Sequence, residues 1–239
     1  RLQGDWSSDV CSSDLAQWLQ IRQQKPDYVI LWGWGVMNPT ALRTAAKTGF
    51  SRDKIVGVWW SGAEEDTVPA GDAAKGYTAA GFNPAGTNFG VIQDIQKHVY
   101  AKNKGNMEDK SRVGSVYYNR GVVHGIVYVE AIRTAQEKFG KGQPLTGEQM
   151  RWGFENLKID AARLKAIGAD GFMPDLNITC ADHEGSGKLK FQQWDGSKWT
   201  VVTDWIEGDR ELVRGMIEES AAAYAKEKGI TPRDCSAES

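Results

Sequence analysis

The sequence predicts an α/β protein in which helices flank a mainly parallel sheet. The continuously apolar run at residues 28–32 is typical of a strand buried on both faces, as in a parallel sheet, and residues 54–60 are expected to be a second buried strand. Segments with helical periodicity separate these runs, so strands and helices alternate along the first half of the chain. This alternation favours helices on both faces of the sheet. Ligands of such sheets lie beyond the carboxyl ends of the strands.

Local signals place the boundaries of the elements in this first half. Pro26 stops an opening amphipathic helix, and Gly33 and Gly35 form the turn after the first strand. Asn38 is expected to cap the next helix, with Pro39 in its first turn. The elements expected in order are a helix at 16–24, a strand at 28–32, a helix at 39–47, strands at 54–60 and 75–82, and helices at 91–102, 117–139, 146–157 and 161–167.

Late in the chain the apolar period changes to two, which is typical of antiparallel strands. The segment KLKFQQWDGSKWTVVTDW, residues 188–205, holds two alternating runs. They meet at Asp195-Gly196, a favoured two-residue hairpin turn. An amphipathic helix at 209–228 is expected to follow the hairpin.

The first fifteen residues, RLQGDWSSDVCSSDL, fit none of this pattern, because they follow neither the helix period nor strand alternation. Read back into codons, DWSSDVCSSDL is similar to a translated sequencing-library adapter. Segments of foreign origin are set aside in fold reasoning. Residues 1–15 are therefore expected to be a non-native leader, with the native sequence beginning near Ala16.

Composition and charge narrow the classes of function. The formal net charge of −2 comes without a basic cluster, which argues against a nucleic-acid partner. The longest apolar run, VILWGWGVM, is too short to span a bilayer, so no direct membrane insertion is expected. Cys180 and Cys235 are expected to be unrelated thiols, with a disulfide as the alternative, which would contribute about 4 kcal/mol on the chain-entropy model.

Several short motifs suggest chemistry but are incomplete. Gly33-Trp-Gly35 resembles the start of a dinucleotide fingerprint, but Asn38 stands where the third glycine belongs. Cys180-Ala-Asp182-His183 lacks the further ligands of a metal site or the partners of a nucleophile, so a surface loop is expected there. We therefore expect neither a metal nor a cofactor, and no catalytic residues.

Two further groups of residues have a structural and a functional interpretation. Glu64, Glu65 and Asp66 fit a solvated helix start, with Glu64 the best candidate for a ligand contact. Trp59 and Trp60 should point to opposite faces of their strand, so one of them is expected to line a cleft. His124 is expected to be a packing residue on an apolar helix face.

The order of the segments KPDYVILWGWG, LRTAAKTGF, DKIVGVWW, GDAAKGY and VVHGIVYVEAIRTA, followed by the hairpin, resembles the second half of a type I periplasmic binding protein. The closest group is the branched-chain amino-acid type of solute receptor in ABC transporters. The resemblance implies two α/β lobes, most of the first being absent from this sequence. It divides the chain into the leader at 1–15, the second lobe at 16–118, crossover helices of the first lobe at 119–187, a hairpin of the second lobe at 188–206, and a C-terminal helix and tail at 207–239.

The resemblance also implies where a solute binds, between two lobes that close on it by hinge motion. The family's aromatic contact falls on Trp34 or Gly35. Its acidic contact falls where this chain has Trp59, Trp60 and Ser61. Glu64 is the substitute acid, and Tyr117 is a further wall.

The function implied is a periplasmic receptor that delivers a small carboxylate-bearing solute to the permease of an ABC importer. Tryptophan in the place of the acid favours a solute with an apolar or aromatic body, either a hydrophobic amino acid or an aromatic acid. A ligand-sensing receptor domain of the same fold and an α/β enzyme are the alternatives.

Overall fold

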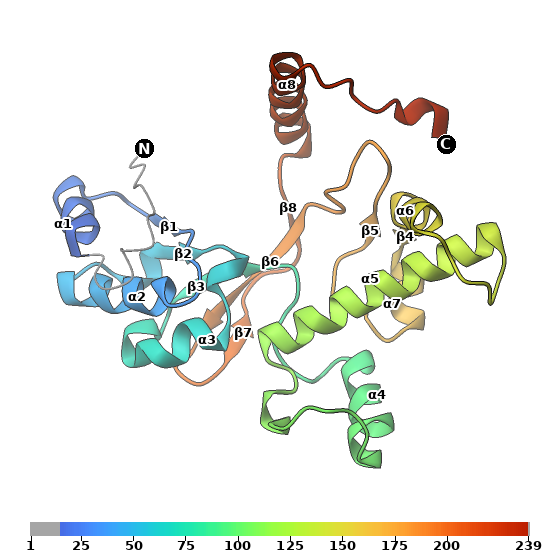
Figure 1. Cartoon of the computed structure of the whole chain (residues 1–239). Helices are drawn as coiled ribbons and strands as arrows, with labels where there is room; N and C mark the ends of the chain where they lie inside the picture. Colours follow the sequence, from blue (N-terminus) through green and yellow to red (C-terminus); the bar gives the residue numbers. More distant parts are fainter. Residues whose placement is uncertain (1–14, 239) are drawn as a thin grey trace.

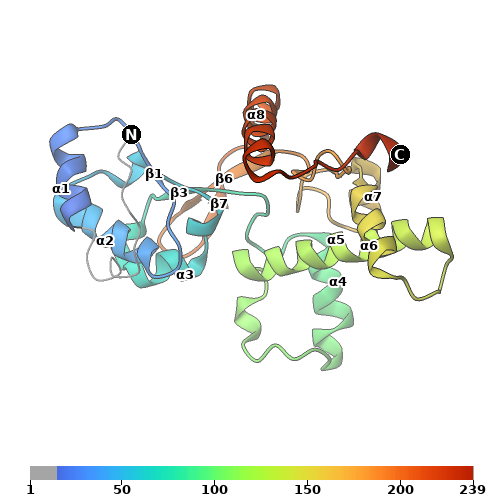
Figure 2. The same ribbon diagram turned by 45° about the horizontal axis from the view of Figure 1, so that its top comes forward.

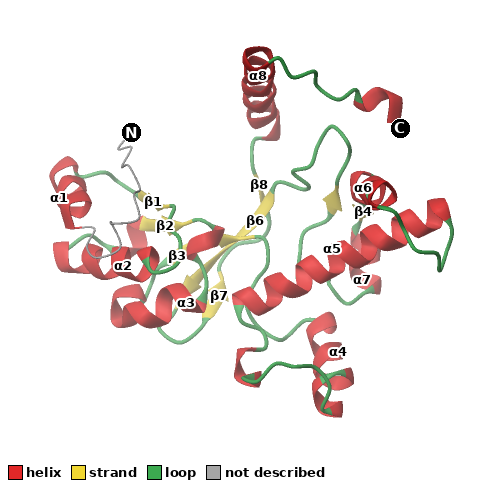
Figure 3. Ribbon diagram, in the orientation of Figure 1, coloured by secondary structure: helices red, strands yellow, loops and turns green. Residues whose placement is uncertain are grey.

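The computed structural model describes residues 15–238, beginning with helix α1 (Leu15–Gln24). The expected leader at residues 1–15 lies outside the described residues, apart from Leu15. The described chain builds two units with separate apolar cores (Figure 1). The first unit contains the main sheet, and the second is mainly helical, as the colouring by secondary structure shows (Figure 3).

The main sheet begins with three parallel strands, as the sequence predicts. Its order is β1-β2-β3-β6-β7, with β8 paired to β6. The last three strands run antiparallel to their neighbours. The strands are β1 (Val29–Leu31), β2 (Ile55–Gly57), β3 (Thr78–Gly81), β6 (Lys188–Trp194), β7 (Trp199–Val201) and β8 (Ile206–Glu207). The α/β fold class is thereby confirmed.

Among the described residues, the apolar core of the first unit lies against one face of this sheet. Leu31 and Ile55 point into that core, whereas the neighbouring Ile30 is 73% exposed. The expectation that the first strand is buried on both faces is therefore wrong for this chain. The covering elements are α1, α2 (Met37–Thr48), α3 (Glu64–Thr67) and the 3-10 segment η4 (Val68–Ala74).

The second unit packs helices around the long helix α5 (Val116–Phe139). Its other elements are α4 (Gly90–His98), α6 (Gly147–Glu155), α7 (Ala161–Ala166) and the short pair β4 (Lys158–Ile159) and β5 (Leu176–Asn177). The amide of Val91 donates to the carbonyl of Gly168 at 2.9 Å, and Ile92 is fully buried in this second core. Helix α4 therefore packs in the second core.

Helix α5 begins in one unit and continues through the other. Val116, at its first turn, belongs to the core of the sheet unit, whereas Val123, two turns later, belongs to the helical unit. Figure 2 shows this helix extending from the sheet region along α6 and α7. Residues in its first turns consequently lie beside the strand ends.

The hairpin of β6 and β7 differs from its predicted form in the turn. Trp194 pairs with Trp199, so four residues form the loop rather than two. The Asp195 carboxylate accepts from the amides of Ser197 (2.8 Å) and Lys198 (2.9 Å). These hydrogen bonds stabilise the longer loop, which the Asp-Gly pair alone does not reveal.

Helix α8 (Arg210–Lys228) projects away from both units (Figure 1) and has no buried residue. The remaining 3-10 turns are η2 (Arg52–Lys54), η3 (Trp59–Ser61), η5 (Tyr100–Lys102), η6 (Lys110–Arg112) and η7 (Cys235–Glu238). Between Leu15 and Glu238, no helix combines the length and the apolar character that crossing a membrane requires.

Candidate ligand-binding site

Four tryptophans cluster at the carboxyl ends of the parallel strands β1 and β2. Ring centroids are 6.0 Å apart for Trp32 and Trp59, 5.1 Å for Trp59 and Trp60, and 5.0 Å for Trp60 and Trp34. Trp32 is 59% exposed and Trp34 is 64% exposed, while the other two are half-buried. We call these four residues the tryptophan cluster. It forms an open aromatic surface at the edge of the sheet where ligands of parallel sheets bind.

Trp59 and Trp60 are neighbours in this cluster because the second strand is shorter than predicted. It ends at Gly57, and the 3-10 turn η3 follows, so the two indoles do not point to opposite faces. A side chain at position 57 would meet the Tyr77 hydroxyl at 1.8 Å. The glycine therefore permits the close approach of Tyr77 beneath the strand end.

Ser61 holds the two strand ends together. Its hydroxyl lies 3.1 Å from the carbonyl of Leu31 and 3.3 Å from that of Gly33, and it accepts from the amide of Gly33 at 3.2 Å. Ser61 is fully buried, so the expectation of a direct solute contact is not supported by its position. Its place in the structure is that of a support for the tryptophan cluster.

A buried polar pair lies under the same turn. The Asn38 side-chain amide donates to the Trp60 carbonyl at 2.9 Å and to the Asp66 carboxylate at 2.7 Å. Asn38 therefore does not cap its helix as predicted, and Val36 occupies the cap position. Asp66 also accepts from the amide of Ala63 at 2.9 Å. Burial raises the pKa of Asp66, although these donors act in the opposite direction.

Arg120 lies directly beside the cluster and was not predicted from the sequence. Its Nη2 donates to the Trp59 carbonyl at 2.8 Å. Its Cζ lies 5.1 Å from the ring centroid of Phe82 and 5.2 Å from that of Tyr117. Tyr117 is 37% exposed, which keeps it a candidate wall of the site. The signal available in the sequence was the spacing, since Arg120 follows Tyr117 by three residues and so shares its helix face.

The remaining predicted site residues are at this edge of the sheet. Gly35 is exposed and has a φ of +55°, a left-handed conformation that suits glycine. Glu64 is half-buried, and its Oε2 accepts from the amide of Val116 at 3.0 Å, at the start of α5. Asp66 is buried rather than solvated, which corrects the expectation for this acidic run. Trp32 was missed, although it stands in the same apolar run as Trp34.

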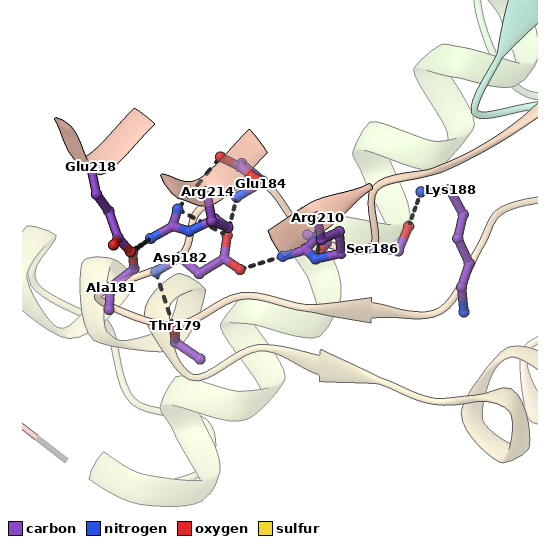
Figure 4. A network of polar contacts seen from close by, with 10 residues as sticks. Thr179, Ala181, Asp182, Glu184, Ser186, Lys188, Arg210, Arg214 and Glu218 are labelled. Atoms are coloured by element: carbon purple, nitrogen blue, oxygen red, sulfur yellow. Dashed lines mark hydrogen bonds and ion pairs between the residues drawn. The ribbon is translucent and has the colours of Figure 1, made fainter. Parts of the chain in front are cut away.

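The loop at Cys180 has a structural role, because a disulfide and ion pairs connect it to the C-terminal part of the chain. Cys180 forms a disulfide with Cys235, which corrects the expectation of unrelated thiols. Arg210 and Arg214, from the first turns of α8, pair with the Asp182 carboxylate (Figure 4). The disulfide and the two arginines thus hold α8 and the C-terminal tail to this loop. The two cysteines are far apart in sequence and meet because the tail returns to the loop.

The histidines form no constellation for metal binding. His183 lies 3.3 Å from the Glu155 carboxylate, which Arg233 also contacts. His124 is exposed on α5, so it is not the packing residue that was expected. In the stretch that the structure describes, no group of three or more histidine, cysteine or acidic side chains is arranged to hold a metal ion.

The sequence matches a known protein family. Residues 9–198 match the family described as periplasmic binding protein. The chain therefore belongs to the periplasmic binding protein family, and its type I fold is that of the receptors it resembles. A comparison with curated protein sequences returned no match.

Solved structures agree with this assignment. A protein of the Pseudomonas fluorescens group, described as an ABC transporter permease, is 51% identical, with a TM-score of 0.89 over 93% of this chain and 54% of its own length. A branched-chain amino acid ABC transporter protein from Thermus thermophilus, with bound valine, is 20% identical, with a TM-score of 0.66 over 87% of this chain and 52% of that one. A solute-binding protein from R. palustris, in complex with benzoate, is 12% identical, with a TM-score of 0.54 over 81% and 48% of the two chains. The chain therefore spans about half the length of these relatives.

Proposed function

We propose that this chain is the larger part of the second lobe, with the crossover helices, of a periplasmic solute receptor. The receptor delivers a small carboxylate-bearing solute with an apolar or aromatic body to the permease of an ABC importer. The single observation that carries the proposal is the tryptophan cluster at the carboxyl ends of β1 and β2. An aromatic wall of this kind takes up an apolar ligand body, and a few polar groups fix the orientation of the ligand.

The position of the cluster supports a cleft between two lobes. Helix α5 leaves the sheet unit beside the cluster, because Arg120, in its first turns, donates to the Trp59 carbonyl. The proteins with bound valine and with benzoate share the fold over 87% and 81% of this chain. Both ligands combine a carboxylate with an apolar body, which agrees with the proposed solute class. The proposal is a binding protein, because the chain belongs to the periplasmic binding protein family.

The test is calorimetric titration of the whole receptor that contains this chain, with valine, phenylalanine and benzoate as probes. Trp60 contacts both Trp34 and Trp59, so Trp60→Ala removes the centre of the aromatic surface. We expect at least tenfold weaker binding of the best probe, since one large aromatic contact contributes about 1.5–3 kcal/mol.

Trp152→Ala is the matched control. Trp152 is a half-buried tryptophan of the second unit that packs on Phe139 at 5.3 Å. Its loss should leave the affinity unchanged. Equal affinity of the wild type and Trp60→Ala would remove the cluster from the binding site, and a wild type that binds none of the probes would contradict the solute class.

A further inference from the structure

We infer that Arg120 is the residue of this lobe that binds the solute's carboxylate. The inference rests on the proposed function and extends it, because it assigns the anionic end of the solute to a particular side chain. The tryptophan cluster would then hold the apolar body, and the guanidinium beside it would set the ligand's direction and charge.

The structure fixes Arg120 in place without neutralising it. One amino group, Nη2, donates to the Trp59 carbonyl at 2.8 Å, and the guanidinium carbon lies about equally far from the rings of Phe82 and Tyr117. A backbone carbonyl and two aromatic rings orient a guanidinium, but none of them carries a formal negative charge. The arginine is therefore preorganised as a cation, and little side-chain entropy remains to be lost when an anion binds.

Part of the hydrogen-bonding capacity of Arg120 is unused. Its Nε is buried and has no hydrogen-bond partner among residues 15–238. Nη1 has no hydrogen-bond partner among these residues either, since the bond to the Trp59 carbonyl comes from Nη2. A buried donor on a charged group that lacks a partner is costly, and such groups are rare in folded proteins. The buried Nε is out of a solute's reach in this structure, so a carboxylate, the preferred partner of arginine, would bind at the amino groups of the guanidinium.

The buried carboxylate of Asp66 does not pair with Arg120. The charge of Asp66 acts on Arg120, but the Asp66 oxygens are taken up by the Asn38 amide and the backbone of Ala63. No carboxylate oxygen in the described part of the chain lies within ion-pair distance of Arg120. A positive charge is therefore held beside the tryptophan cluster, in partly buried surroundings that strengthen its attraction for an anion.

The charge of the ligand is what the test varies. The probes are acids paired with their neutral amides, benzoate with benzamide and valine with valinamide, titrated into the whole receptor. The variants are Arg120→Gln, Arg120→Lys and the control Arg43→Gln. Arg43 is an exposed arginine of the same unit whose guanidinium donates to the Pro69 carbonyl. Circular dichroism and thermal melting confirm that each variant is folded.

The wild type and Arg43→Gln should bind the acid at least tenfold more tightly than the amide. Arg120→Gln should lose this ratio, and Arg120→Lys should keep part of it, since lysine retains the charge but not the planar fork. If Arg120 only supports Trp59, Arg120→Gln weakens acid and amide equally and the ratio persists, which overturns the inference and leaves the proposed function standing. If the wild type binds neither member of any pair, the proposed function fails and the inference fails with it.

Discussion

The buried charged groups of the two units have different partners. In the helical unit, the buried carboxylates of Glu130 and Glu155 are each paired with arginine. Glu130 contacts Arg163 at 2.7 Å, and Glu155 contacts Arg233 at 2.6 Å. In the sheet unit, the buried Asp66 has only amide donors, and Arg120 has no carboxylate partner among the described residues. These arginines stabilise the fold, whereas the sheet unit leaves one cation beside an aromatic surface.

The pKa values follow the same division. Hydrogen bonds from Arg163 and Arg133 lower the pKa of Glu130, and hydrogen bonds from Arg233 lower that of Glu155. Burial raises the pKa of Asp66 and lowers that of Arg120, so both groups of the sheet unit are held where their charged forms are disfavoured. Perturbed groups of this kind concentrate at functional sites. The difference supports a structural role for the first set and a binding role around the second.

The largest effect is expected from Asn38→Ala, which removes the link between the Asp66 carboxylate and the tryptophan cluster. Asn38 is fully buried and bonds both the Asp66 carboxylate and the Trp60 carbonyl. The substitution leaves a buried carboxylate with one donor fewer, so we expect a loss of about 3 kcal/mol in the free energy of unfolding. Urea denaturation measures this loss, and calorimetry should show weaker solute binding in the same variant.

Thr48→Ala is a matched control for Asn38→Ala, because Thr48 is a buried residue of the same helix whose hydroxyl bonds only to its own helix backbone. It should cost about 1 kcal/mol and leave binding intact. Equal stability losses in the two variants would show that Asn38 is an ordinary buried residue and not a support of the site.

Asn38 also shows how much of the structure could be predicted from the sequence. The order of strands and helices, the parallel start of the sheet and the candidate residues Trp34, Trp59 and Trp60 all follow from local patterns. The position of Asn38 before Pro39 fits a helix cap equally well, and the structure decides otherwise only through contacts with residues 60 and 66. Local patterns identify elements, but they do not show which polar side chain bridges two of them.

The same limit explains the other corrections. The strand at 54–60 ends early because Ser61 bonds the end of β1, a contact across 30 residues. Arg120 is charged and lies in a helix, a pattern that normally indicates a solvated face. Only the approach of Trp59 and Phe82 from other elements makes it part of the site. The disulfide between Cys180 and Cys235 likewise depends on the path of the C-terminal tail, which local patterns do not show.

An intermediate effect is expected for Glu130→Gln in the helical unit. Glu130 is 2% exposed and bonds to Arg163 and Arg133, whose partial exposure reduces the strength of the pairs. We expect a loss of about 2 kcal/mol near neutral pH. Because the folded pKa is lowered, this contribution is present above the unfolded pKa of about 4.5 and is lost as the pH falls through the folded value.

Urea denaturation between pH 7 and pH 3 should therefore show the difference between Glu130→Gln and the wild type shrinking with acid. Glu137→Gln is the control, since Glu137 pairs with the same Arg133 but is 49% exposed. An exposed pair of this kind contributes less than about 1 kcal/mol. A deficit of Glu130→Gln that is independent of pH would exclude the ion pairs as its cause.

The smallest effect is expected for Asp66→Asn, and its pH dependence should have the opposite sign. The folded pKa of Asp66 is raised by burial, so its contribution to stability is fully present below the unfolded pKa of about 3.8 and is lost as the pH rises through the folded value. Asparagine cannot ionise, so the variant should gain stability relative to the wild type as the pH rises from 3 to 7.

The exposed Asp72→Asn gives the reference curve for this measurement. Glu130 and Asp66 then test the comparison between the units directly. A carboxylate paired with arginine and one buried without a cation should make stability change with pH in opposite directions. If the stability of Asp66→Asn relative to the wild type falls as the pH rises, Asp66 is stabilised in its charged form. Arg120 would then be its counterion in solution, and the free cation beside the tryptophan cluster would not exist.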